Sequence, residues 1–199
     1  MAGKIVVINK YQKAPDGYVR IDVTSHNKPW RPYLSPFYLG PVPLPDGGQA
    51  RVMENAWQFS KVYADMADAD GNPTKKFFEW REWGCNESRA HRHPHEGKPL
   101  YAYWGGARYG YIDARKHILI PIYYNCVLNN RKGFDTLAQK LSEGYNIALA
   151  DFDGYDHKAK GMTYEDVVNY PGHVMGHGHI LAMMLEDQEL LNRIFRGEA

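Results

Sequence analysis

Four acidic residues have the spacing and the surroundings for acid–base chemistry. Glu54 lies near the start of an amphipathic helix predicted from RVMENAWQFSK, with Trp57 one turn further on. A carboxylate beside a large aromatic side chain is poorly hydrated on one side, and this can tune it as a catalytic acid. Asp151, Asp153 and Asp156 follow a buried-strand pattern, where sites are commonly built. A capped surface helix and a polar exit from the core would show the same patterns, so both interpretations stay open.

The stretch Lys28–Asp46 contains candidate binding residues. It carries seven prolines or glycines, which exclude a long helix or an inner strand. Arg31 and Phe37 lie in it. The aromatic residues of this loop either pin it to the core or form the wall of a pocket, because loops with fixed aromatics often carry binding residues. On the second interpretation, Arg31 and Phe37 contact a ligand.

Two further segments combine glycine with residues suited to binding. Tyr101–Tyr111 mixes aromatics with glycines, so Tyr111 is a candidate platform for a planar base, although a packed turn fits equally well. Gly172–Gly178 precedes a predicted helix, and backbone amides at such a helix start can hold phosphate. Gly176 and Gly178 are the candidates there. The segment lacks the lysine of a P-loop, so the pattern is weak.

Three histidines, His91, His93 and His95, alternate along a polar segment. In an extended chain they would project to one side, as zinc or nickel ligands can. Pro94 interrupts the run, and metal sites usually draw their ligands from separate elements. We therefore predict a solvated loop without a functional metal, and no cofactor.

Composition limits the class of protein. The 199 residues fit one domain, residues 1–199, and the hydrophobic fraction of 44% supports a core. A net charge of +1 without a basic block argues against strong duplex-DNA binding. Cys85 and Cys126 form no disulfide framework, and no apolar run approaches the length of a membrane span. We expect a soluble, cytoplasmic protein.

Hydrophobic periodicity predicts an α+β fold, a single mainly helical domain with a small β-sheet. The predicted strands are Lys4–Ile8, Tyr18–Val23 and Tyr145–Phe152. The predicted helices are Val52–Asp68, Lys75–Trp83, Ile112–Leu128 with a kink or break at Pro121, Phe134–Leu141, Tyr164–Asn169 and His179–Phe195.

Three pieces of the chain, in this order, resemble the NADAR family. Leu34–Tyr38 is similar to the family's L-S-N-F-Y motif, and Met53–Lys61 resembles its "v-E-H-a-y-Q-a-x-K" helix, with the glutamate, glutamine and lysine in place. Ile147–Asp156 and Gly172–Leu185 resemble the closing strand, glycine-rich loop and Leu/Met-rich helix. Together the pieces cover about a fifth of the chain. The resemblance implies a NADAR-like fold.

The chain departs from the family pattern at several polar positions. Pro36 replaces the asparagine of the first motif, and Asn55 replaces the histidine after the glutamate. The tryptophan-glycine pair after the late acids and an asparagine near Met175 are absent. These losses indicate a divergent branch and favour the alternative of a non-catalytic protein that binds an NAD- or ADP-ribose-derived nucleotide.

The resemblance implies hydrolysis of an N-glycosidic bond. Family members cleave ribose from a damaged aminopyrimidine of the riboflavin pathway, or remove ADP-ribose from guanine bases. Breaking the bond from ribose C1 to nitrogen builds positive charge on the sugar, which a carboxylate stabilises, while a second carboxylate activates water or protonates the base. The expected partner is therefore a nucleotide-like small molecule or an ADP-ribosylated base. A role in nucleic-acid base modification is a third possibility.

The predicted roles follow from this chemistry. The catalytic candidates are Glu54 with Asp151 or Asp156. The predicted binding residues stack on the base or hold phosphate, and they are Arg31, Phe37, Trp57, Lys61, Tyr111, Gly176 and Gly178.

Overall fold

Small sheets and short to medium helices make up the fold in the computed structural model, which describes residues 3–199. The first sheet is parallel, in the order β1-β8-β2, with β1 at Ile5–Asn9, β8 at Asn146–Asp151 and β2 at Tyr18–Asp22. A two-stranded antiparallel sheet pairs β3 (Val42–Pro43) with β4 (Gln49–Ala50). An antiparallel sheet in the order β5-β6-β7 contains Lys61–Val62, Tyr101–Trp104 and Ala107–Tyr109.

Helices supply most of the regular structure, which confirms the predicted mainly helical α+β class. They are α1 (Arg31–Leu34), α2 (Met53–Gln58), α3 (Lys75–Asn86), α4 (Tyr111–Ala114), α5 (Ile120–Asn129), α6 (Lys132–Ser142), α7 (Tyr164–Asn169), α8 (His177–Glu186) and α9 (Gln188–Phe195). Single 3-10 turns, η1 and η3, cover Ala64–Met66 and Lys158–Lys160, and a π-helical turn, η2, covers Arg115–Leu119. None of the helices in the described part of the chain has the length and apolarity needed to cross a membrane.

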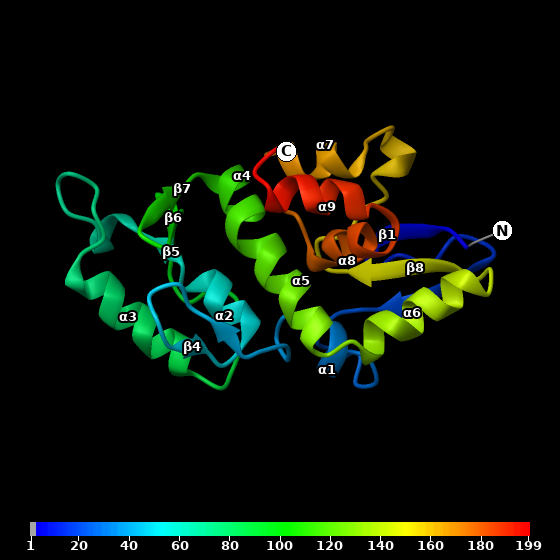
Figure 1. Ribbon diagram of the computed structural model, residues 1–199, viewed down its shortest axis with the longest axis horizontal. Coiled ribbons are helices and arrows are strands. Elements are labelled where there is room, and N and C mark those ends of the chain that lie inside the picture. Colours follow the sequence, from blue (N-terminus) through cyan, green and yellow to red (C-terminus); the bar gives the residue numbers. More distant parts are fainter. Residues whose placement is uncertain (1–2) are drawn as a thin grey trace.

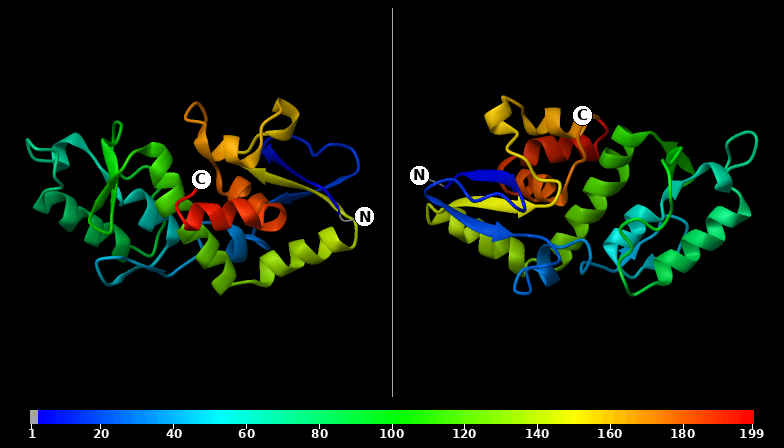
Figure 2. Two further views of the ribbon diagram at one scale, coloured as in Figure 1. Left: turned by 45° about the horizontal axis from the view of Figure 1, so that its top comes forward. Right: turned by 180° about the vertical axis from the view of Figure 1, so that it is seen from behind.

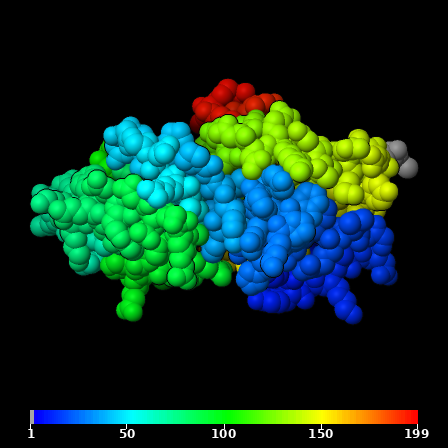
Figure 3. Space-filling view, turned by 90° about the horizontal axis from the view of Figure 1, so that it is seen from below, coloured from blue at the N-terminus to red at the C-terminus, as the bar shows by residue number. Residues whose placement is uncertain are grey.

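The molecule is elongated, with the continuous helix α4–η2–α5 between two groups of elements (Figure 1). On one side of it lie the β1-β8-β2 sheet and helices α6 to α9, and on the other lie α2, α3 and the β5-β6-β7 sheet. The view from behind in Figure 2 repeats this arrangement. Figure 3 shows the N-terminal third, coloured blue to cyan, running across one face from one group to the other. The largest hydrophobic cluster likewise joins residues of both groups, from Ile5 to Ile194.

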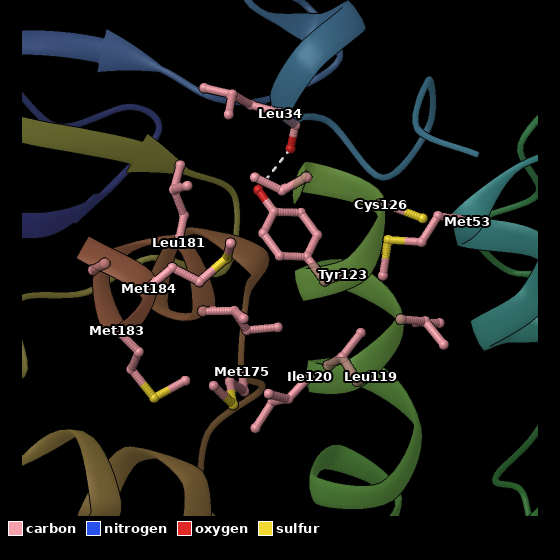
Figure 4. Close-up of a cluster of buried hydrophobic side chains, with 14 of the residues drawn as sticks. Leu34, Met53, Leu119, Ile120, Tyr123, Cys126, Met175, Leu181, Met183 and Met184 are labelled. Atoms are coloured by element: carbon pink, nitrogen blue, oxygen red, sulfur yellow. Dashed lines mark hydrogen bonds between the residues drawn. The ribbon is translucent and has the colours of Figure 1, made fainter. Parts of the chain in front are cut away.

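The centre of the core lies where α5 faces α8 (Figure 4). Tyr123 is fully buried there, and its hydroxyl donates a hydrogen bond of 2.8 Å to the Leu34 carbonyl. β8, the middle strand of the parallel sheet, is buried from Ile147 to Asp151. Helices cover parallel sheets, so such a strand must be apolar along most of its length. The pattern IALA satisfies this requirement, and Asp151 ends the run.

The structure corrects two predicted helices. The predicted helix Val52–Asp68 is wrong, because α2 ends at Gln58 and the following residues form β5 against β6. Strand pairing outweighs the helical spacing at this point. The predicted helix His179–Phe195 breaks at Asp187, whose side chain accepts a hydrogen bond from the Leu190 amide and caps α9.

The helix containing Pro121 continues without a split. It passes from α4 through the π-helical turn into α5, and the Ile120 amide donates to the Arg115 carbonyl five residues back. A proline inside a regular α-helix clashes with the carbonyl four residues before it. The wider turn immediately before Pro121 accommodates the proline ring. Arg115 is the first residue of this turn.

Candidate functional site

A cavity of about 730 Å³ lies between α2 and the segments that follow β8 and precede α8. Glu54 of α2 and Asp153, two residues after β8, both line it. Trp57, Tyr109 and Tyr111 contribute aromatic wall. Small-molecule sites usually enclose about 300–1,000 Å³ and combine apolar wall with a few convergent polar groups. The cavity is therefore the candidate functional site.

The start of α2 is fixed by the backbone of the preceding loop. The amides of Met53 and Glu54 donate to the carbonyls of Leu39 and Pro36, at 2.8 and 3.0 Å. These bonds satisfy two of the amides that a helix start leaves without partners. Pro36 itself lines the cavity. The motif that contains Pro36 thus positions Glu54.

Glu54, Gln58 and Lys61 form a chain of hydrogen bonds along one wall. Gln58 Nε2 donates to Glu54 Oε1 at 2.8 Å, and Lys61 Nζ donates to Gln58 Oε1 at 2.7 Å. Lys61 Nζ also lies 4.8 Å from the centre of the Trp57 ring. All four side chains line the cavity. The predicted residues Glu54, Trp57 and Lys61 are therefore brought together.

Burial shifts the protonation of this wall. It raises the pKa of Glu54, although the Gln58 hydrogen bond and the charges of Lys61, His177 and Arg92 act in the opposite direction. Burial also lowers the pKa of Lys61 to about 8, against the opposing effect of Glu54. A carboxyl group that holds its proton more tightly is suited to general acid catalysis.

Asp153 contributes the second acidic group of the cavity. Burial raises its pKa, and the negative charge of Asp151 raises it further. The charges of Arg92, His177 and His173 lower it. Two carboxyl groups from distant parts of the chain, each with a raised pKa, thus line one cavity. Perturbed acids in a cleft are a recognised sign of a functional site.

Asp151 lies behind the cavity wall and does not line it. It is 2% exposed, and its Oδ2 atom accepts a hydrogen bond of 2.9 Å from the Gly178 amide. Asp151 Oδ1 lies 3.4 Å from His177 Nδ1. A carboxylate at the N-terminus of α8 is stabilised by the helix dipole. Asp151 therefore occupies the Gly178 amide at which we predicted phosphate.

The close approach of Asp151 explains the glycine at position 176, a predicted binding residue. A Cβ atom on Gly176 would lie 2.1 Å from Asp151 Oδ2, so no other residue fits without displacing the carboxylate. Gly176 lines the cavity, whereas Gly178 packs against Asp151. Gly176 and Gly178 thus serve the packing of an internal carboxylate.

Three other predicted residues lie away from the cavity wall. Asp156 Oδ1 accepts a hydrogen bond of 3.0 Å from the Ala159 amide at the start of η3. The guanidinium of Arg31 lies over the Tyr38 ring, 4.5 Å from its centre. The Phe37 amide faces Ser35 Oγ at 3.4 Å. Tyr111, by contrast, lines the cavity and is 46% exposed.

Arg115 was not anticipated from the sequence. Its side chain is 1% exposed and donates to four backbone carbonyls, those of Val167, Val168, Tyr170 and His173. The segment it holds leads into the cavity wall from Pro171 to His177. An arginine within an apolar helix face is a signal that could have pointed to this role.

The three alternating histidines have different surroundings. His91 Nε2 lies 3.7 Å from Glu87, and the His95 ring stacks on Tyr63 at 4.0 Å. His93 lines the cavity. Among residues 3–199, no group of three or more histidine, cysteine or acidic side chains is arranged to hold a metal ion. The absence of a functional metal stays a prediction.

Comparison with known proteins gives one family. Residues 4–160, well over half of the chain, match the family of unknown function DUF6939. The chain belongs to this family. Neither a curated protein nor a solved structure matches it. The DUF6939 match includes Glu54 and Asp153 but ends before Gly176 and His177, so it covers only part of the cavity wall.

Proposed function

We propose that this DUF6939 protein hydrolyses the N-glycosidic bond between ribose C1 and a nucleobase nitrogen in an ADP-ribosyl or ribosyl-phosphate compound. The observation that carries the proposal is the presence of Glu54 and Asp153 in one aromatic-lined cavity, both with raised pKa values. The resemblance to NADAR sequences supports the same class of reaction. The cavity volume suits a nucleotide-sized ligand.

In this proposal the two acids have different roles. Glu54, the more deeply buried, donates a proton to the leaving base as the C1–N bond breaks and its electron pair passes to nitrogen. Asp153 stabilises the positive charge that develops on the sugar and accepts a proton from the water that attacks C1. Trp57 and Tyr111 stack on the base, and Lys61 with Arg92 binds phosphate.

Substitution of the two acids tests the proposal. We expect Glu54→Gln and Asp153→Asn each to lower turnover ~100-fold or more while ligand affinity is nearly kept, because each removes a transition-state interaction. Glu143→Gln, at an exposed acid that follows the last residue of α6, is the matched control. The substrates are ADP-ribosylated guanine nucleoside or DNA, and the riboflavin-pathway ribosyl phosphate, with release followed by mass spectrometry. Equal release by all four proteins would contradict the assignment.

A binding function is the second candidate. Pro36 lines the cavity at the position where NADAR sequences carry asparagine, so one polar group of the family pattern is missing from the wall. Asn55, which replaces the family histidine, turns away and holds the 87–91 segment. Tight binding of ADP-ribose by calorimetry, without release from any of the substrates, would favour a nucleotide-binding protein over the hydrolase.

A further inference from the structure

His177, the first residue of α8, has an acceptor opposite each ring nitrogen. Its Nε2 atom lies 3.0 Å from the Val23 carbonyl oxygen, and its Nδ1 atom lies 3.4 Å from Asp151 Oδ1. The side chain is 13% exposed and lines the cavity. A neutral imidazole has one donor and one acceptor nitrogen, whereas the protonated ring has two donors. Only the protonated ring satisfies both oxygens when Asp151 is ionised.

The surroundings of Asp151 fix its carboxyl group in place beside His177. Its second oxygen accepts a hydrogen bond from the Gly178 amide, at the N-terminus of a ten-residue helix. Both the hydrogen bond and the helix dipole stabilise a negative charge. Because Gly176 packs against the same oxygen, the carboxyl group has little freedom to turn away from His177. Asp151 therefore stabilises a positive charge on the imidazole.

The charged and titratable groups around His177 come from several elements. Glu54 of α2 and Asp153 after β8 each have their pKa lowered by the charge of His177, against the effect of burial. The positive charge of Arg92 also lowers the pKa of these two acids. From α5, the Tyr123 ring lies 5.6 Å from the His177 ring, and burial holds its pKa well above the usual range, so Tyr123 stays neutral. His177 thus lies beside Asp151 and lines the same cavity as Glu54 and Asp153.

We propose that His177 is a positively charged positioning residue, which Asp151 holds in the doubly protonated form and whose charge favours the ionised forms of Glu54 and Asp153 in the same cavity. The effect of His177 on catalysis rests on the proposed hydrolase function. The double protonation of its ring is independent of that function, because it is argued from the two acceptor oxygens. Separate experiments therefore test the charge on the ring and its effect on catalysis.

The first experiment is nitrogen NMR of the histidine rings in the whole protein at neutral pH, with His177 assigned by comparison with His177→Asn. We expect the chemical shifts of a doubly protonated ring for His177 in the wild type, and of a neutral ring in Asp151→Asn. A neutral His177 ring in the wild type overturns the proposal, whether or not Asp151→Asn folds. A charged ring in a protein that hydrolyses none of the substrates supports the charge and contradicts only the hydrolase function.

The second experiment is the pH profile of hydrolysis. We expect His177→Asn to lower kcat roughly tenfold or more at neutral pH, with a smaller change in KM, because Asp153 loses a charge that favours the ionised form it needs as the base. The acid limb of the profile should move to higher pH, because the two acids lose a charge that favours their ionised forms. His177→Lys should restore part of this shift, and the exposed His26→Asn should change neither value. An unchanged pH profile in His177→Asn overturns the positioning role.

Discussion

The two walls of the cavity are built in different ways. The α2 wall (Glu54, Gln58 and Lys61) comes from eight consecutive residues, joined by side-chain hydrogen bonds. The β8–α8 wall (Asp153, Gly176 and His177) joins residues more than twenty positions apart, with the backbone packed against Asp151. The first wall is a local motif and the second is a product of tertiary packing. Substitutions in the first should therefore alter chemistry, and those behind the second should alter stability.

The largest expected effect is loss of Arg115, which holds the segment before the β8–α8 wall. Arg115→Met removes the donor from two buried and two partly buried carbonyls, and we expect the free energy of unfolding to fall by about 4 kcal/mol. Urea denaturation measures this change. Arg131→Met, which removes an exposed pair with Asp135, should cost no more than ~0.5 kcal/mol. Similar losses of unfolding free energy in the two variants would mean that the hydrogen bonds of Arg115 do not hold this segment in place.

Gly176→Ala tests the close packing of the same wall. The new Cβ atom meets Asp151 Oδ2, and we expect a loss of about 3 kcal/mol in the free energy of unfolding by urea denaturation. Gly110 has an ordinary backbone conformation, and a Cβ atom added there would lie 3.9 Å from its nearest neighbour, so Gly110→Ala should cost much less. If Gly176→Ala is as stable as Gly110→Ala, Asp151 can move, and the argument for a fixed acceptor beside His177 fails.

Acid should weaken the packing behind the β8–α8 wall. Burial lowers the pKa of His179 to about 4 and also lowers the pKa of His157. In the unfolded chain the pKa of histidine is near 6.5, so the unfolded chain binds these protons at a higher pH than the folded protein does. Stability is therefore lost as the pH falls below about 6.5. Relative to His179→Gln, the free energy of unfolding of the wild type should fall by about 2 kcal/mol between pH 7 and pH 5. Parallel pH curves for the two proteins would show that His179 is protonated equally in both states.

Asn55 lies behind the α2 wall and gives the comparable test there. Its side chain donates to the carbonyls of Glu87 and Arg89 and accepts from the His91 amide. Asn55→Ala should lower the free energy of unfolding by about 2 kcal/mol, because three backbone groups lose their partners. Asn86→Ala, at an exposed asparagine, is the control. If Asn55→Ala lowers the free energy of unfolding less than Asn86→Ala does, contacts other than those of Asn55 hold the 87–91 segment in place.

The smallest expected effect is electrostatic and lies within the α2 wall. Glu54 raises the pKa of Lys61, which burial lowers to about 8. In Glu54→Gln the pKa of Lys61 should fall below that value, because the buried ammonium loses its carboxylate partner. NMR titration of the lysine Nζ groups measures the change, with the exposed Lys13 as an internal reference. An unchanged Lys61 would indicate that Gln58 alone, without the charge of Glu54, determines its environment.

Several elements were predictable because they are local. The strand at β8 follows from its unbroken apolar run, and α7 from a Thr-Tyr-Glu-Asp start that forms a capping box. Glu54, Trp57 and Lys61 share the cavity because neighbouring positions of one helix and its exit must lie close together. The end of α2 was missed because β5 pairs with β6, about forty residues away in sequence.

By itself, the sequence determined the α+β class, the apolar central strand and the cluster of Glu54, Gln58 and Lys61, since propensity and short-range spacing decide these features. Only the tertiary structure decided that Asp153 lines the cavity, that Asp151 supports His177 from behind, and that Asp156 lies elsewhere. Three acids after one strand look equivalent in sequence. The turn after β8 and the approach of α8 give each a different environment, because burial and hydrogen bonding depend on residues that the local pattern does not contain.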